Sequence, residues 1–94
     1  MKGNDLNQFI DDLYSMGGPE KEFLYKGKRY FLESSNVGAN VIEMVVFQCF
    51  GEEKYVFRCR GKTFAECVEQ FVKAGIFDGK TIYEAEQDIE VLYG

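Results

Sequence analysis

Apolar side chains recur every three or four residues near the start of the chain, at Leu6, Phe9, Ile10, Leu13 and Met16. This spacing predicts an amphipathic helix with one buried face. Either Asn4 or Asp5 can cap the helix, because both side chains accept hydrogen bonds from the first backbone amides. The triplet Gly17-Gly18-Pro19 predicts its end.

The next segment consists of two β-prone runs joined by a short turn. Residues 22–32 read as a hairpin whose turn at 26–27 contains a glycine that tolerates positive φ. In that register Phe23 faces Tyr30, and a cross-strand aromatic pair contributes about 0.2 to 1 kcal/mol relative to an alanine pair. The small polar residues 34–40 predict a loop.

A second hairpin is predicted from Val41–Phe50 and Tyr55–Arg60, around a turn at residues 51–54. One of its faces is apolar and is expected to join the core: Ile42, Met44, Val46, Phe50, Tyr55, Phe57 and Cys59. The other face is mixed and carries Val45, Phe47, Cys49 and Val56 beside Glu43, Arg58 and Arg60. Such a face is either partly covered or forms an exposed apolar strip with a charged rim.

Two capping-box patterns follow the hairpins. Thr63 and Glu66 open a predicted helix that Gly75 ends, with an apolar stripe at Phe64, Cys67, Val68, Phe71 and Val72. A second capping box at residues 81–84 predicts a short helix to Gln87, followed by a strand at Ile89–Tyr93.

The predicted order is therefore α-β-β-β-β-α-α-β, which defines an α+β fold. We expect residues 1–94 to form a single domain with an antiparallel sheet of about five strands and its helices packed on one face.

Composition supports a globular domain with an aromatic core. Of the 94 residues, 46% are hydrophobic, with nine Phe and six Tyr, which is enough apolar surface to offset the entropy of folding.

The net charge of -5 disfavours unassisted binding to a polyanion. The N-terminus lacks a basic stretch followed by an apolar run, and no segment is long enough to span a membrane, so we expect a cytoplasmic protein.

The chain has no histidine, which removes the commonest acid–base residue and the commonest metal ligand. Cys67 lies near a predicted helix N-terminus, where a thiol pKa is lowered, but it also belongs to the buried stripe and has no base beside it. We interpret Cys67 as a core residue. Neither a phosphate-binding glycine motif nor a calcium loop is present, so no cofactor and no metal are expected.

Three cysteines fit a reducing compartment better than a disulfide framework. With a turn at residues 52–53, Cys49 faces Val56 and Cys59 faces Val46, which places the two thiols on opposite faces of the sheet. All three thiols are therefore expected to be free.

Two charged groups raise alternatives. The hairpin tip at Lys26, Lys28 and Arg29 lies near tyrosines, and aromatics beside cations suit single-stranded nucleic acid, although the overall charge makes this partner the less favoured one. The alternating acidic residues Glu84, Glu86, Asp88 and Glu90 would form a continuous stripe if the whole segment were a strand. That stripe would be a solvated edge or a docking surface for a basic partner.

Two short motifs carry a resemblance. The stretch from Glu22 to Tyr30, EFLYKGKRY, and the later stretch from Ile76 to Ile82, IFDGKTI, resemble a class of small uncharacterised proteins from Gram-positive and gut bacteria, several of them carried on mobile elements. The resemblance implies a bacterial cytosolic accessory protein. It implies no activity and no functional residues.

These observations favour a non-enzymatic, acidic interaction module, such as an inhibitor or a phage-type accessory factor. The expected binding surface is the strip of Val45, Phe47 and Cys49 with its rim of Arg58 and Arg60. The partner is another protein or a second copy of the chain, which would make a homodimer.

Overall fold

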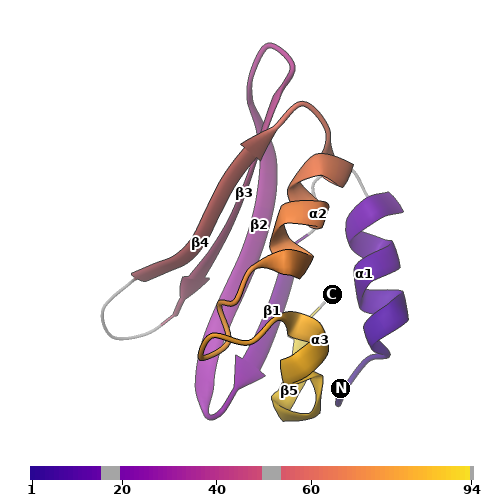
Figure 1. The fold of residues 1–94 in the computed structure, drawn as a ribbon, viewed down its shortest axis with the longest axis vertical. Coiled ribbons are helices and arrows are strands. Elements are labelled where there is room, and N and C mark those ends of the chain that lie inside the picture. Colours follow the sequence, from indigo (N-terminus) through magenta and orange to yellow (C-terminus); the bar gives the residue numbers. More distant parts are fainter. Residues whose placement is uncertain (16–19, 50–53, 94) are drawn as a thin grey trace.

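The structure, a computed structural model, describes residues 1–15, 20–49 and 54–93 (Figure 1). Its elements in chain order are α1 (Leu6–Ser15), β1 (Glu20–Tyr25), β2 (Lys28–Gly38), β3 (Val41–Gln48), β4 (Lys54–Gly61), α2 (Phe64–Lys73), α3 (Ile82–Ala85), a 3-10 turn (Glu86–Asp88) and β5 (Ile89–Tyr93). The α+β class and the element order are those predicted. The predicted helix stop at 17–19, residues 51–53 of the predicted turn, and residues Met16 and Phe50 lie outside the described residues. Lys54, also predicted for the turn, begins β4.

The five strands form one antiparallel sheet in the order β4-β3-β2-β1-β5. The predicted pair of Phe23 and Tyr30 is confirmed, with the two rings stacked and their centres 5.6 Å apart. Lys26 and Gly27 both have positive φ, 48° and 80°, which is the turn geometry that matches the twist of a tight hairpin. Lys2 pairs with Glu90 on the outer side of β5.

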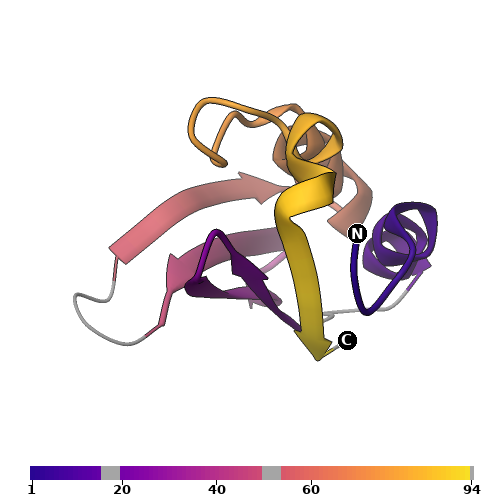
Figure 2. The ribbon, with the colours of Figure 1, turned by 90° about the horizontal axis from the view of Figure 1, so that it is seen from below.

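All helices of the described residues pack on one face of the sheet (Figures 1 and 2). The core between the two layers is closed mainly by Phe9, Leu13, Val68 and Phe71 from the helices and by Phe23, Leu32, Met44, Val46 and Ile89 from the strands. In the described part of the chain, no helix has the length and apolar character needed to cross a membrane.

The prediction of a loop at residues 34–40 is wrong. Strand β2 continues to Gly38 and pairs with β3 almost to its start, so only a tight turn at Ala39 and Asn40 separates them. Asn40 has a φ of 57°, a conformation that asparagine tolerates well. Small polar residues predicted a loop because this end of β2 is largely exposed, and its pairing with β3 decides its conformation instead.

The predicted register of the second hairpin is also wrong. Cys59 pairs with Met44 rather than Val46, a shift of two residues that keeps Cys59 on the core face. A bulge then leaves Val56 as an extra residue, because Val46 pairs with Phe57 while Phe47 pairs with Tyr55. Tyr55, predicted for the core, is 58% exposed, whereas Val56, predicted for the opposite face, packs against the core.

The helix caps are those predicted, with one exception at α2. Asp5 caps α1, and its carboxylate accepts from the amide of the second helical residue at 2.7 Å. Thr81 forms the complete predicted capping box at α3. At α2 the Thr63 hydroxyl accepts from the Glu66 amide as predicted, but the Glu66 carboxylate accepts from the amide of Lys62 instead of Thr63.

A buried ion pair joins α1 to β1. The Lys21 side chain is only 1% exposed, with its Nζ atom 3.1 Å from the Asp12 Oδ2 atom and 5.2 Å from the centre of the Phe9 ring. Asp12 also accepts a hydrogen bond from Gln8. The hydrogen bonds from Gln8 and from Lys21 hold the pKa of Asp12 below its usual value. A buried ammonium group is costly without such a partner.

Removing Asp12 should therefore destabilise the protein more than removing the lysine charge. Asp12→Asn leaves the ammonium of Lys21 without its counter-charge, whereas Lys21→Met removes that charge and keeps an apolar side chain of similar length. Because the pKa of Asp12 is lower in the folded state, its stabilising effect is present above about pH 4 and is lost as the pH falls through the folded-state value.

Urea unfolding of the parent and both variants at pH 7 and at pH 3 measures this effect. The free energy of unfolding should be lower for Asp12→Asn than for Lys21→Met at pH 7, and the gap between Asp12→Asn and the parent should narrow at pH 3. A larger loss for Lys21→Met, or a gap that does not change with pH, would contradict this assignment.

Candidate functional site

The sheet face opposite the helices carries a row of three aromatic side chains. Strand pairing places Phe31 of β2 beside Phe47 of β3, and Phe47 beside Tyr55 of β4. The centres of neighbouring rings lie 5.8 Å apart in both pairs, with the first pair stacked and the second edge-on. The helices of the described residues lie on the other face of the sheet (Figure 2). Of this row, which we call the aromatic row, Tyr55 is 58% exposed and Phe31 and Phe47 are half-buried.

Further apolar residues extend the aromatic row. Val45 lies next along β3, between Arg58 on β4 and Glu33 on β2. At the other end of the face, Leu24 pairs with Arg29, and the Cys49 amide donates to the Arg29 carbonyl at 2.8 Å. We call this whole surface the open face; its apolar members are Leu24, Phe31, Val45, Phe47, Cys49 and Tyr55.

The structure brings together all five residues predicted for the interaction strip: Val45, Phe47, Cys49, Arg58 and Arg60. The sequence prediction missed Leu24, Phe31 and Tyr55. Phe31 alternates with core residues in the first hairpin, so its position on the open face was available, but its contact with Phe47 depends on β2 pairing with β3. Tyr55 was assigned to the wrong face because the bulge reverses its direction.

Charged side chains are distributed unequally over the open face. On the β4 side, the Glu43 carboxylate lies 2.9 Å from Arg60 and 3.8 Å from Arg58, so one acidic group is shared by two guanidinium groups. The guanidinium carbon of Arg58 also lies 4.9 Å from the centre of the Tyr55 ring. This side of the face therefore carries net positive charge.

The β1 side has the opposite sign. Glu22 pairs with Arg29 at 3.3 Å, but Glu20 and Glu33 lie directly opposite each other on β1 and β2. Within the described residues, no ion pair joins either Glu20 or Glu33 to a basic group. Like charges directly opposite in a sheet destabilise it, so this position favours an additional cation from outside.

The basic hairpin tip is not assembled as one cationic surface. Lys26 lies 3.4 Å from the Asp78 carboxylate, and Arg29 points to Glu22 on the open face. Lys28 is exposed. The Tyr25 hydroxyl donates to Asp78 at 3.1 Å, and hydrogen bonds from Tyr25 and then Lys26 lower the pKa of Asp78. Two of the three predicted nucleic-acid ligands therefore have carboxylate partners within the fold.

The acidic stripe does not form. Glu84, Glu86 and Asp88 lie in α3 and the 3-10 turn, and only Glu90 lies in β5. The helical period of the preceding residues, with the capping box at Thr81, directs these side chains differently from a strand. Across the described residues, no group of three or more Cys, Asp or Glu side chains is arranged to hold a metal ion.

Cys59 and Cys67 are buried in the core and lie close to each other. The Cys59 thiol lies 3.8 Å from the Cys67 carbonyl, and the Cys67 thiol lies 3.6 Å from the Ile42 carbonyl. Burial raises the pKa of Cys59 to about 12 and also raises the pKa of Cys67. Cys67 is thus a core residue, as predicted, and Cys49 lies on the opposite face of the sheet from Cys59, also as predicted.

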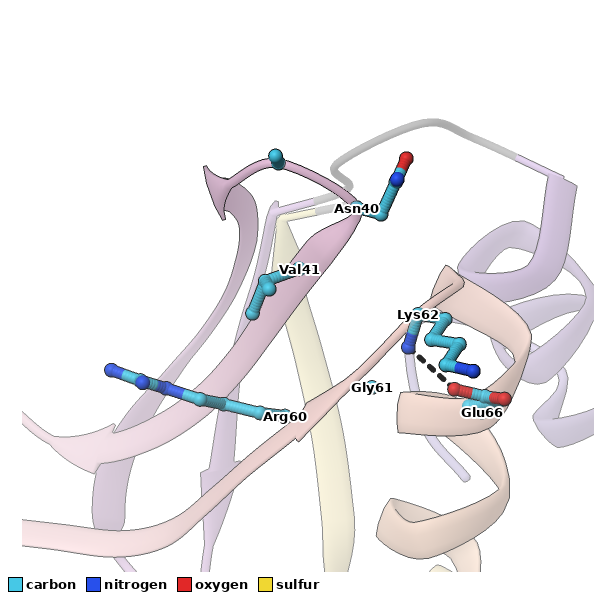
Figure 3. A pocket seen from close by; sticks show the side chains of 7 residues that line it. Asn40, Val41, Arg60, Gly61, Lys62 and Glu66 are labelled. Carbon is cyan, nitrogen blue, oxygen red and sulfur yellow. Dashed lines mark hydrogen bonds between the residues drawn. The ribbon is translucent and has the colours of Figure 1, made fainter.

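A hollow of about 810 Å³ opens where β4 passes into α2 (Figure 3). Gly61 permits this close approach, because a Cβ atom there would lie 2.9 Å from the Cβ of Glu66. The Glu66 carboxylate is already bonded to the Lys62 amide, and the Arg60 side chain extends away from both. The hollow therefore offers few converging polar groups for a ligand.

Comparisons with known protein families, with curated proteins and with solved structures give no match to this chain. The resemblance to small bacterial accessory proteins stays a prediction.

Thiol labelling tests the assignment of the three cysteines. In the folded protein at pH 8, Cys49 should react fastest, because it is only half-buried while burial and raised pKa values suppress the thiolates of Cys59 and Cys67. The rate of reaction with a chromogenic disulfide measures this, and Cys49→Ser should remove the fast phase. Equal rates for all three thiols would show that the core assignment is wrong.

Proposed function

We propose that this protein is a non-enzymatic interaction module that binds another protein molecule through the open face. The observation that carries the proposal is the aromatic row of Phe31, Phe47 and Tyr55, which the helix layer leaves uncovered. A sheet face that only contacts water is normally polar, so a row of three aromatic rings on it favours contact with a partner.

The chemistry of the open face matches that of protein interfaces. Aromatic and arginine side chains are enriched where binding energy concentrates, and a polar rim usually surrounds them. Here Tyr55 and Arg58 stack on each other beside Phe47, and Glu43 and Arg60 lie at the border. The rings are held by β-strands, so little side-chain freedom is lost on binding.

Other functions have less support. The two most buried thiols have raised pKa values and the chain lacks histidine, which gives little basis for nucleophilic or acid–base chemistry. Nucleic-acid binding by Lys26, Lys28 and Arg29 is weakened as a hypothesis because Lys26 and Arg29 already pair with carboxylates.

The setting of the protein belongs to the same proposal. Three cysteines, two of them deep in the core, suit a reducing compartment, so we propose a cytoplasmic location. Accessory and inhibitor proteins act by binding other proteins, and the resemblance to small bacterial accessory proteins agrees with that role.

Replacing Phe47 by glutamate tests the open face. Phe47→Glu places a charge in the centre of the aromatic row and should weaken association with the partner by about 2 kcal/mol or more, roughly 30-fold. The matched control is Tyr83→Glu, because Tyr83 is a 53% exposed aromatic residue on α3, in the helix layer. It should leave association unchanged.

Light scattering at increasing concentrations and chemical cross-linking in a bacterial extract measure association for the parent and both variants. Circular dichroism checks that each variant is folded. The proposal fails if Phe47→Glu and the parent form the same complexes, or if the loss is as large for Tyr83→Glu.

A further inference from the structure

We propose that the partner of the open face is a second copy of this chain, packed face to face across a two-fold axis. This inference rests on the proposed function of the open face as a binding surface. It adds the identity and the orientation of the partner, and both follow from the distribution of charge over the face.

The two sides of the open face carry complementary charges. On the β4 side, the Arg58 and Arg60 side chains are 58% and 68% exposed and share the single carboxylate of Glu43. On the β1 side, Glu20 and Glu33 face each other, and no ion pair within the described residues compensates them. The aromatic row lies beside both groups. A surface with a cationic half and an anionic half can complement itself.

A two-fold axis parallel to the strands achieves this match. Such an axis keeps each position along the strands and reverses the order of the strands between the two copies. With the axis between β2 and β3, Arg58 of one copy lies over Glu20 of the other, and Phe47 lies over Phe31. Each of these contacts occurs twice, so Arg58 and Glu20 pair at both sides of the dimer and Phe31 and Phe47 of the two copies meet in the centre.

The alternative two-fold axis, perpendicular to the strands, gives a poorer match. It places β4 of one copy over β4 of the other, which brings the Arg58 and Arg60 side of both copies together. Like-charge contacts across an interface oppose association. The distribution of charge therefore selects the first arrangement.

The overlap of the two open faces is sufficient for a weak dimer. With the axis between β2 and β3, four strands of each copy overlap, because β5 has no strand of the other copy opposite it. Four strands spaced about 4.8 Å apart, each about 25 Å long, cover about 480 Å² in projection, or about 960 Å² for two copies. That area is typical of weak, transient interfaces. Two sheets packed face to face about 10 Å apart would interdigitate their side chains as in a β-sandwich.

Charge reversal on opposite sides of the face provides the test. One variant carries Arg58→Glu and Arg60→Glu, and the other carries Glu20→Arg and Glu33→Arg. Each variant alone should self-associate at least tenfold more weakly than the parent, because like charges then meet twice across the axis. An equimolar mixture should form a heterodimer, because the reversed charges of one variant meet the reversed charges of the other, and the unchanged charges of the two variants also meet with opposite signs.

Sedimentation velocity from about 1 µM to about 1 mM measures the mass of the parent, of each variant and of the mixture. The expected result is a parent dimer, at least tenfold weaker self-association of each variant, and recovery of the dimer in the mixture. The matched control carries Lys73→Glu and Lys80→Glu on the helix side; both lysines are exposed, and it has the same net charge as the first variant. It should dimerise like the parent.

Reversal of both arginines beside Glu43 can also disturb folding, so the single variants Arg58→Glu and Glu20→Arg form a second pair, assayed in the same way. A mixture that stays monomeric, or variants that dimerise alone, would overturn the proposed orientation. A parent that is monomeric at every concentration would overturn the second copy as partner. In that case, loss of cross-linked complexes with other proteins in Phe47→Glu would leave the proposed function standing.

Discussion

The helices of this protein cover one face of its sheet, and the other features of the surface depend on that arrangement. Helices α1 and α2 have ten residues each and pack side by side over the same face, where Phe9, Phe71 and Met44 are fully buried. A sheet with a packed face and an open face is stable only if the open side suits its surroundings. The aromatic row on that side therefore calls for a physical explanation.

Stability of the fold alone does not require the aromatic row. Cross-strand aromatic pairs contribute up to about 1 kcal/mol each, but β-branched polar residues would serve a solvated face without exposing large apolar surface. The opposed Glu20 and Glu33 are unfavourable in the isolated chain, whereas Arg58 and Arg60 share one carboxylate. The contact that we propose with a second copy would place Arg58 over Glu20 and would bury the aromatic row, whereas the net charge of -5 opposes non-specific association.

Local signals predicted most of the fold, and pairing between strands determined what they missed. The register of Phe23 with Tyr30 and the cap at Thr81 depend on a few neighbouring residues, so both could be predicted from the sequence. The bulge at Val56 and the extension of β2 through residues 34–38 depend on which strand lies alongside, and no local pattern encodes that. The same limit explains why the predicted strip lacked Tyr55.

The most direct test of this account is a contact that only two copies can make. Glu22 and Tyr55 lie on β1 and β4 of the same sheet, separated by two strands, or about 14 Å at ordinary strand spacing. In the proposed dimer, Glu22 of one copy lies over Tyr55 of the other. An isotope-filtered nuclear Overhauser experiment on a mixture of labelled and unlabelled protein should show cross-peaks between the Glu22 methylene groups and the Tyr55 ring. Cross-peaks from Tyr83 on the helix side instead, or none in a concentrated sample, would contradict the account.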